Sequence, residues 1–581
     1  MTQGMEAASA RSGHPTLKVE GLSLHSTYDP VREADLQVTR FLTDRPGKGP
    51  VVVLGMGLGY HVERLLQEGA ARIILVEPRN EVFRAAIETR NLKRILTRCR
   101  HLLVGRTVED VVEHLKATRF PFEDQRVFVH QPSLRLNQPY FDRLMTRLRA
   151  LNVLSGLKLK ILVVPPIYGG SLPIADYCVK AFRTLGHRAT MLDNSMYYPA
   201  LQGIDETTEN ANHRDQLRGS LTQHAAERVM ARCLAVKPDV VFALAQAPLT
   251  PGVLERMRTF DFATAFWFVE DFREFEYWKV VADKYQHFFA IQKEEVFKTS
   301  EDLDHVGFAY LPLACDPKIH RPLRLSERDR DRFGSDVSFL GAGYPNRQIL
   351  FHRLVDLDFK IWGTEWNRGS ILGKLVQEKG RRITPRESVK IFNASAINLN
   401  LHSSTYHKGI NPAGDFVNPR TFEIAGCGGF QLVDPRSHLA ELFEPGRELT
   451  CFESAEDLRE KIAYYLSRPD ERASIAAAGH RRTRLDHTYQ KRMARALEVI
   501  VERDIDRFAA LGERRQKPDR LIAEAGANSE LGRFLSRFTG EDHLTLEKIV
   551  SGIHRGEGDL TEPEVIFLLM HEFAKSTGAR P

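Results

Sequence analysis

The sequence predicts an α/β protein with three Rossmann-like domains and a helical C-terminal tail. Three times along the chain, beginning at residues 51, 159 and 337, a short apolar strand runs into a glycine-bearing loop and then into a helix. Such alternation is typical of parallel sheets that are covered by helices. The expected tail, residues 509–581, has no comparable strands but carries apolar stretches at 544–553 and 565–573, which indicates a small helical appendage.

Composition excludes several classes of protein. The 581 residues, of which 42% are hydrophobic and 27% charged, provide for three or four soluble domains with their own cores. A net charge of +6 over this length does not indicate a nucleic-acid partner. The six cysteines are far apart and form no Cys-x-x-Cys pair, which fits a reducing compartment without structural zinc. Because we see neither a signal peptide nor an apolar run long enough to span a bilayer, we expect a cytoplasmic protein.

The expected first domain, residues 1–157, has a glycine-rich loop between a strand and a helix. Gly55, Gly57 and Gly59 follow the first strand, and Glu77 ends the second. In a Rossmann-type unit such glycines let the backbone approach a ligand, and such an acid accepts hydrogen bonds from a ribose. Methyltransferases bind S-adenosylmethionine in this way. The alternative is a tight turn that binds nothing, because every sharp strand-to-helix turn favours glycine.

Residues 51–140 carry three motifs that resemble the N-terminal domain of the motility accessory factors. These motifs are Leu-Gly-Met-Gly-Leu-Gly-Tyr-His at 54–61, Val-Glu-Pro at 76–78 and His-Gln-Pro-Ser at 130–133. Proteins of that family are linked to flagellin glycosylation. The resemblance implies a role for this domain in acceptor binding or assembly, with flagellin as a candidate acceptor.

The expected second domain, residues 158–325, also places glycines and an acid where parallel strands end. Gly169 and Gly170 lie in the loop after its first strand, where they can approach a phosphate or an acceptor, or simply form a tight turn. Asp271 follows an aromatic strand at residues 262–268. Because the carboxyl ends of parallel strands face the ligand crevice, we expect all three residues at a cleft. A helix cap is the alternative role for Asp271.

The expected third domain, residues 326–508, has two basic residues near its strand ends. Gly341, Gly343 and Arg347 follow the first strand, and we expect Arg347 to reach a donor phosphate while the glycines clear space for a nucleotide. His402 ends a later strand, and Lys408 follows in a polar loop as a second cation for a diphosphate. Each cation can also be an ordinary solvated side chain. We expect the terminal helix of this domain at residues 489–508.

Residues 412–434 carry the most informative pattern of the chain. Asn418 is a good N-cap, and Pro419 suits the first helical position because it has a fixed φ and no N–H. The free N–H groups and the dipole at such a helix start favour a diphosphate. Arg420 can add a charge-assisted contact, and Glu423 is placed to accept from a sugar or ribose hydroxyl. The segment therefore predicts a nucleotide-sugar pocket, with an ordinary capped helix as the alternative.

The run Asn-Pro-Arg-Thr-Phe-Glu at 418–423, followed by a glycine-rich turn, resembles the donor-site signature of GT-B glycosyltransferases, specifically the CgeB-like (spore maturation protein) group. The resemblance implies that the second and third domains form a GT-B enzyme that moves a sugar from a nucleoside diphosphate to a protein or glycan acceptor. Retaining GT-B enzymes often carry two glutamates separated by seven residues, one facing the donor sugar and one the nucleotide ribose. Here Glu423 takes the second position, and Asp415, a shorter acid, takes the first.

No Asp-x-Asp metal motif lies in a suitable loop, which suggests catalysis without a divalent ion, and we expect no cofactor. Preorganised positive charge would then stabilise the leaving diphosphate. We expect catalytic roles for four residues, namely Asp415, Glu423, Arg420 and Lys408. We expect donor contacts from Gly341, Gly343, Arg347, His402, Asn418 and Glu423. Two other functions stay open: an S-adenosylmethionine-dependent methyltransferase in the first domain, and a non-catalytic glycan-binding scaffold.

Overall fold

The computed structural model describes residues 4–70, 72–293, 306–404, 407–514, 518–538 and 544–577. The chain divides into two compact units. Unit 1 comprises Met1–Leu157 together with Val501–Pro581, and unit 2 comprises Lys158–Ile500.

Unit 1 contains a parallel four-stranded sheet of order β6-β5-β4-β7. The strands are β4 (Val51–Leu54), β5 (Ile73–Glu77), β6 (His101–Val104) and β7 (Arg126–Val129). A small antiparallel sheet precedes them, formed by β1 (Met5–Ser9), β2 (Pro15–Val19) and β3 (Leu22–Ser23). The helices of this part are α1 (Pro30–Asp44), α2 (Tyr60–Gln67), α3 (Asn80–Thr89), α4 (Lys93–Arg98), α5 (Val108–Ala117), α6 (Gln131–Leu136) and α7 (Gln138–Ser155).

Strand β4 shows why this sheet is covered on both faces. Val51 and Val53 pack into the core that includes α1 and α2, while Val52 and Leu54 pack into the core that includes α5 and α7. Successive side chains of a strand point to opposite faces, so an unbroken apolar strand requires helices on both sides. The predicted Rossmann-like domain is confirmed.

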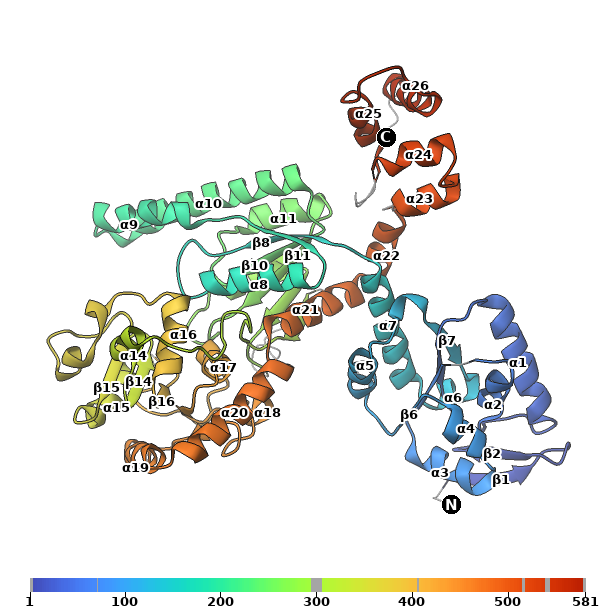
Figure 1. Ribbon diagram of the computed structural model, residues 1–581, viewed down its shortest axis with the longest axis horizontal. Helices are drawn as coiled ribbons and strands as arrows, with labels where there is room; N and C mark the ends of the chain where they lie inside the picture. Colours follow the sequence, from blue (N-terminus) through green and yellow to red (C-terminus); the bar gives the residue numbers. More distant parts are fainter. Residues whose placement is uncertain are drawn as a thin grey trace. The chain divides into compact units, whose positions relative to one another are not determined.

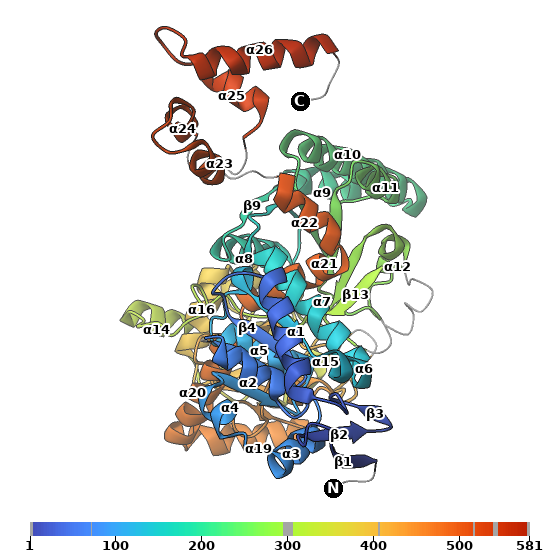
Figure 2. The ribbon, with the colours of Figure 1, turned by 90° about the vertical axis from the view of Figure 1, so that its right-hand side faces the viewer.

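The C-terminal tail is helical, as predicted. Its helices are α22 (Ile505–Arg514), α23 (Pro518–Ala525), α24 (Glu530–Ser536), α25 (Leu546–Ile553) and α26 (Glu562–Thr577). Helix α22 packs against α7. Figure 2 shows α25 lying beside α26, and Phe534, Ile549 and Ile553 form part of a small core there.

The first half of unit 2 is a six-stranded parallel sheet of order β13-β12-β11-β10-β8-β9 (Figure 1). Its strands are β8 (Lys160–Val164), β9 (Arg188–Met191), β10 (Val240–Leu244), β11 (Ala263–Phe268), β12 (His287–Ala290) and β13 (Gly307–Tyr310). Its helices are α8 (Leu172–Thr184), α9 (Tyr198–Thr207), α10 (Ala211–Val236), α11 (Pro251–Thr259) and α12 (Trp278–Val281). Helix α10 lies beside both α9 and α11.

The second half of unit 2 is a five-stranded parallel sheet of order β15-β14-β16-β17-β18. Its strands are β14 (Val337–Leu340), β15 (Phe359–Trp362), β16 (Ile397–Asn400), β17 (Gln431–Val433) and β18 (Thr450–Cys451). Its helices are α14 (Glu327–Phe333), α15 (Pro345–Phe351), α16 (Pro385–Ala394), α17 (Pro419–Gly426), α18 (Leu439–Leu442), α19 (Ala455–Leu466), α20 (Pro469–Asp486) and α21 (Tyr489–Arg503).

Helix α21 joins the two halves. The ring of Tyr489, at its start, packs against Trp267 and Tyr177 of the first half. Arg492 donates from Nε to the carbonyl of Pro312 at 2.8 Å. The predicted return of the terminal helix onto the first half is confirmed. The predicted span of 489–508 was too long, because α21 ends at Arg503 and α22 begins at Ile505.

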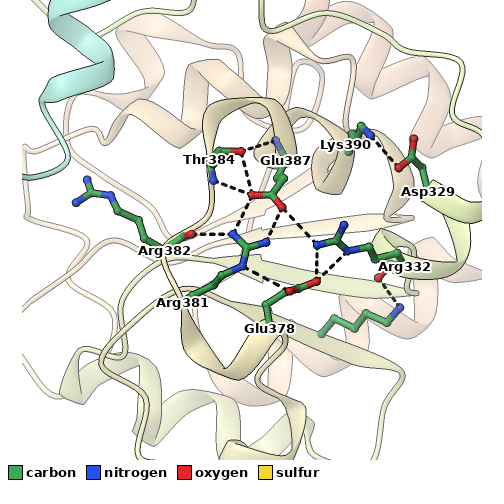
Figure 3. Close-up of polar contacts among 9 residues, drawn as sticks. Asp329, Arg332, Glu378, Arg381, Arg382, Thr384, Glu387 and Lys390 are labelled. Carbon is green, nitrogen blue, oxygen red and sulfur yellow. Dashed lines mark hydrogen bonds and ion pairs between the residues drawn. The ribbon is translucent and has the colours of Figure 1, made fainter.

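A network of charged side chains holds the long loop after β15 in the second half of unit 2. Arg381 donates to both carboxylate oxygens of Glu387 on α16, at 3.0 and 2.5 Å (Figure 3). Arg332 of α14 donates from Nε to Glu378 at 2.8 Å and from Nη2 to Glu387 at 3.4 Å. These contacts are solvent-exposed, so we expect them to orient the loop more than to stabilise the fold.

The loops after β14 and β15 approach so closely that Gly343 has no room for a side chain. A Cβ at Gly343 would lie 2.4 Å from the carbonyl oxygen of Glu365. We expect Gly343→Ala to lower the free energy of unfolding by about 1–3 kcal/mol in urea denaturation, because overpacking forces the backbone to shift. The control is Gly219→Ala on α10, where a Cβ meets nothing within 4 Å and alanine favours the helix. Equal stability of the two variants would contradict the packing argument.

Candidate functional site

Helix α17 begins as the sequence predicts, at the carboxyl ends of the strands. Asn418 has extended backbone angles, and its Oδ1 accepts the N–H of Thr421 at 3.2 Å. Pro419 occupies the first helical position. In an open parallel sheet this edge is where ligands bind, so the first turn of α17 is in the right place for a donor phosphate.

Asn418 is held in place by a fully buried polar network. The backbone N–H of Asn418 donates to Nε2 of His402 at 3.1 Å, and Nδ1 of His402 lies 2.6 Å from Oδ1 of Asp434. The side chain of Asn418 also donates to Asn400 at 2.8 Å. His402, Asn418 and Asp434 are all buried. Buried networks of this kind rigidify a structure when their members are satisfied.

His402 was predicted to contact the donor, but both of its ring nitrogens are engaged within the protein. Burial lowers its pKa to about 4, so the ring is neutral near pH 7. Because Nε2 accepts from Asn418, the ring proton lies on Nδ1 and is donated to Asp434. These contacts make His402 a support for the helix start rather than a group that touches the donor.

The guanidinium of Arg347 likewise donates its hydrogen bonds within the protein. Its Nε and Nη2 donate to the carbonyl of Leu401 at 3.0 and 2.8 Å, and its Nη1 donates to the carbonyl of Ala342 at 2.9 Å. Burial lowers the pKa of this guanidinium to about 9. The predicted phosphate contact therefore does not match its geometry, in which Arg347 ties the loop after β14 to the end of β16.

Close packing also explains why the positions near Arg347 are occupied by glycine. A Cβ at Gly341 would lie 2.9 Å from the ring of Phe339, and the backbone of Gly343 lies against that of Glu365. These contacts account for both glycines through packing, and a donor contact of either stays a prediction. Lys408 is exposed in its loop.

Arg420 and Glu423 are the charged side chains of α17 that remain available. Nε of Arg420 is buried and has no hydrogen-bond partner among the described residues. Burial lowers the pKa of Arg420, while the nearby Glu423 opposes this shift. A guanidinium at a helix start with an unused donor is suited to a phosphate or a carboxylate.

Glu423 is a partly enclosed carboxylate, with 17% of its side chain exposed. Burial raises its pKa to about 7, although Arg420 opposes this effect. Its Oε1 lies 3.8 Å from Nε2 of His320. His320 accepts the N–H of Asp316 on Nδ1 at 3.0 Å, so its proton lies on Nε2 and faces Glu423. The geometry leaves Glu423 able to accept a hydrogen bond from a ligand hydroxyl.

Asp415 lies where the two halves of unit 2 meet. Its Oδ1 accepts from Nη1 of Arg273 at 2.7 Å and from Nε2 of Gln292 at 2.9 Å. The same amide nitrogen of Gln292 donates to Oδ1 of Asp271 at 3.1 Å. The structure therefore brings together the predicted Asp415 and Asp271, which are 144 positions apart, since 415 − 271 = 144. Asp271 also accepts the N–H of Arg273, which is a turn contact and no helix N-cap bond.

Sequence reasoning missed several residues of this region. Arg273, Gln292 and His320 belong to no motif, and only their three-dimensional contacts reveal them. Tyr489 belongs to no motif and is only the first residue of the helix predicted at 489–508, yet its hydroxyl is buried without a hydrogen-bond partner among the described residues. Glu423 contributes to raising the pKa of Tyr489, although burial is the larger cause.

Gly169 and Gly170 lie in an open loop. A Cβ at either position meets nothing within 4 Å, and Gly169 has a φ of +116° that favours glycine. This loop leads from β8 to α8, so both residues lie at the carboxyl edge of the first sheet. Their predicted approach to a ligand stays a prediction.

In unit 1 the glycine-rich loop after β4 is packed with side chains. A Cβ at Gly55 would lie 2.2 Å from Ser133, and one at Gly57 would lie 2.4 Å from the ring of His25. Nε2 of His25 accepts the N–H of Leu58 at 2.7 Å. The space that a nucleotide would need beside this loop is therefore occupied by the protein's own histidines.

Glu77 turns back onto that same loop. Its carboxylate accepts the N–H of Met56 at 2.8 Å and that of Arg79 at 3.1 Å. Burial raises its pKa to about 7. Gly59 packs against Ile95, where its φ of +79° favours glycine. These contacts favour the tight-turn interpretation over an S-adenosylmethionine site.

Among the described residues, no group of three or more His, Cys, Asp or Glu side chains could hold a metal ion. In the same part of the chain, no helix is long and apolar enough to cross a membrane.

Comparison with known proteins gives matches in both units. Residues 347–498 match the family model described as Glycosyl transferase-like, and residues 25–116 match the Glycosyltransferase Maf N-terminal domain. The spore protein CgeB of Bacillus subtilis (strain 168) is 28% identical over 197 residues, which cover 32% of this chain and 58% of that protein. An uncharacterized protein of Treponema pallidum (strain Nichols) is 38% identical over 114 residues, covering 19% of this chain and 39% of that protein.

Among solved structures, a glycosyltransferase from Rickettsia africae ESF-5 aligns with a TM-score of 0.43 and 13% identity, covering 59% of this chain and 98% of that one. The chain spans 58% of the length of CgeB and 39% of that of the Treponema pallidum protein, which is less than two thirds of each.

Unit 2 thus contains two parallel sheets, and most of its second half lies in the stretch that matches the glycosyl transferase-like model. The predicted resemblance to the CgeB-like group is confirmed by the match to CgeB, and the resemblance of the first domain to the motility accessory factors is confirmed by the Maf match.

The raised pKa of Glu423 has a consequence for stability. In the unfolded chain Glu423 titrates near 4.5 and in the folded protein at about 7, so the folded state holds its proton more tightly. The contribution of Glu423 to the free energy of unfolding therefore falls as the pH rises from about 4.5 to 7. We expect Glu423→Gln to be more stable than the wild type by about 2–3 kcal/mol at pH 8, with little difference at pH 4.5.

Urea unfolding of both proteins across this pH range measures the difference. Glu77 has a similar shift but is common to both proteins, so its contribution cancels. A stability difference that is constant with pH would contradict the assignment of the raised pKa to Glu423.

Proposed function

We propose that the chain transfers a sugar from a nucleoside diphosphate sugar to a hydroxyl-bearing protein or glycan acceptor. The observation that carries this proposal is the start of α17, where Arg420 has an unused buried donor and Glu423 a carboxylate free to accept. The helix N-terminus and Arg420 supply positive charge for the diphosphate. Glu423 accepts hydrogen bonds from the hydroxyls of the ribose.

The site has to stabilise the diphosphate as it leaves the sugar. Negative charge develops on the leaving phosphate oxygen as the bond to the sugar breaks. Arg420, the dipole of α17 and Lys408 of the loop after β16 stabilise that charge, so that the reaction proceeds without a metal ion. We propose that configuration is retained, with Asp415 on the side of the donor sugar and Glu423 on the side of the ribose.

The first domain would then serve the acceptor. Its match to a Maf N-terminal domain and its filled glycine loop support a role in recognition or assembly over a chemical role. Flagellin stays a prediction as acceptor, and so does a cytoplasmic location.

Calorimetric titration with UDP, GDP, ADP, CMP and S-adenosylmethionine tests the donor site. We expect one nucleoside diphosphate to bind at micromolar concentration, and Arg420→Ala and Glu423→Ala each to weaken it tenfold or more. A tenfold loss corresponds to about 1.4 kcal/mol. Arg420 donates to the diphosphate and Glu423 accepts from the ribose, so each variant loses a charge-assisted contact.

The matched control is Arg353→Ala. Arg353 is an exposed arginine that follows α15, at the opposite edge of the same sheet, and should leave nucleotide affinity unchanged. Binding of S-adenosylmethionine alone, indifferent to Glu423, would overturn the proposal. Nucleotide binding without transfer or donor hydrolysis would instead favour a glycan-binding scaffold.

A further inference from the structure

The first half of unit 2 contains a pocket that the donor site does not explain. It has a volume of about 440 Å³, in the range of small-ligand sites. Its walls come from the loop after β8, the loop after β10 and the helices α9 and α10. Six of its lining residues carry the argument, namely Tyr168, Tyr198, Gln202, Asp205, Arg218 and Gln246.

The pocket lies where the topology of the sheet favours a ligand. Strand β8 has β9 on one side and β10 on the other. The chain leaves β8 for one side of the sheet and later returns to the other side, so the loops at the carboxyl ends of β8 and β10 diverge. In open parallel sheets this switch point is where a crevice forms and ligands bind.

Two tyrosines present their rings at this pocket. The rings of Tyr168 and Tyr198 stack with centroids 5.3 Å apart and planes inclined by 26°. These two residues are 46% and 39% exposed, although large aromatic residues are mostly buried in folded proteins. The face of an aromatic ring is electronegative, and it packs favourably on the C–H groups of a pyranose ring.

Polar side chains with planar groups lie beside these rings. Nη2 of Arg218 donates to Oδ1 of Asp205 at 2.5 Å, and both side chains are about half exposed, at 42% and 46%. Nε of Arg218 is buried and has no partner in the described part of the chain. Guanidinium, carboxylate and amide groups can each bind two neighbouring hydroxyls.

Gln246 is held at this pocket in a strained conformation. Its φ is +60°, which non-glycine residues rarely adopt. Its backbone N–H donates to the hydroxyl of Tyr277 at 2.7 Å, and its side chain donates to Glu270 at 2.6 Å. Tyr277 in turn donates to the other oxygen of Glu270 at 2.9 Å. Such strain, held by surrounding bonds, is found mainly at functional sites.

We propose that this pocket binds a saccharide, so that the acceptor of the transfer is a hydroxyl of a carbohydrate and not of a bare protein side chain. Stacked aromatic rings next to planar hydrogen-bonding groups match the alternating apolar faces and hydroxyl edges of a sugar. The step from saccharide binding to acceptor binding rests on the proposed glycosyltransferase function. The saccharide site itself rests on the pocket alone.

Saturation-transfer NMR on the full chain tests the pocket, with glucose, galactose, N-acetylglucosamine, rhamnose and their short oligomers as probes. We expect at least one of these sugars to bind, and Tyr168→Ala and Tyr198→Ala each to weaken it tenfold or more. Tyr168→Phe should keep most of the affinity because it keeps the ring. The control is Tyr464→Ala, a 43% exposed tyrosine of α19 in the second half.

The outcomes separate this inference from the proposed function. All tyrosine variants should keep the nucleotide affinity of the wild type, which reports the donor site and verifies folding. Sugar binding that depends on Tyr168 in a protein without nucleotide binding would support the pocket and overturn the proposed function. Absence of sugar binding in a protein that binds a nucleotide, or transfer to an unglycosylated peptide at the same rate in wild type and Tyr168→Ala, would overturn the inference.

Discussion

The buried hydrogen bonds that hold the start of α17 are the constraint on which the proposed donor site depends. Asn418 is fixed by Nε2 of His402, and His402 is fixed by Asp434, all without solvent contact. A buried polar group that loses its partner costs free energy, so the helix start has little freedom to move. The dipole of α17 is therefore aimed in a fixed direction before any ligand arrives.

Local sequence signals predicted the fold well because each depends on neighbours in the chain. The N-cap at Asn418, the proline at 419 and the apolar strands, such as β4, form from short-range rules that tertiary contacts then reinforce. The ends of some elements were less predictable. Helix α21 stops at Arg503, five residues short of the expected end, since 508 − 503 = 5.

The roles of individual polar residues could not be predicted as well, because they depend on burial. Arg347 and His402 have the chemistry of ligand-binding groups, but each is turned inward and has its donors or acceptors satisfied by the protein. The glycine-rich loop of unit 1 has the pattern of a nucleotide loop, yet His25 fills the space beside it. A sequence pattern gives residue types and their spacing. Whether the space beside a motif is empty or filled is decided by segments that are remote in the chain.

Because of the contacts of Asp415, neither half of unit 2 can be exchanged by recombination without affecting the other half. Arg273 and Gln292, which hold its carboxylate, lie outside the segment at 347–498 that matches the transferase family model. Recombination that exchanged only the second half of unit 2 for that of a relative would separate Asp415 from Arg273 and Gln292. Compensating substitutions in the first half would then have to follow, which ties the divergence of the two halves to each other.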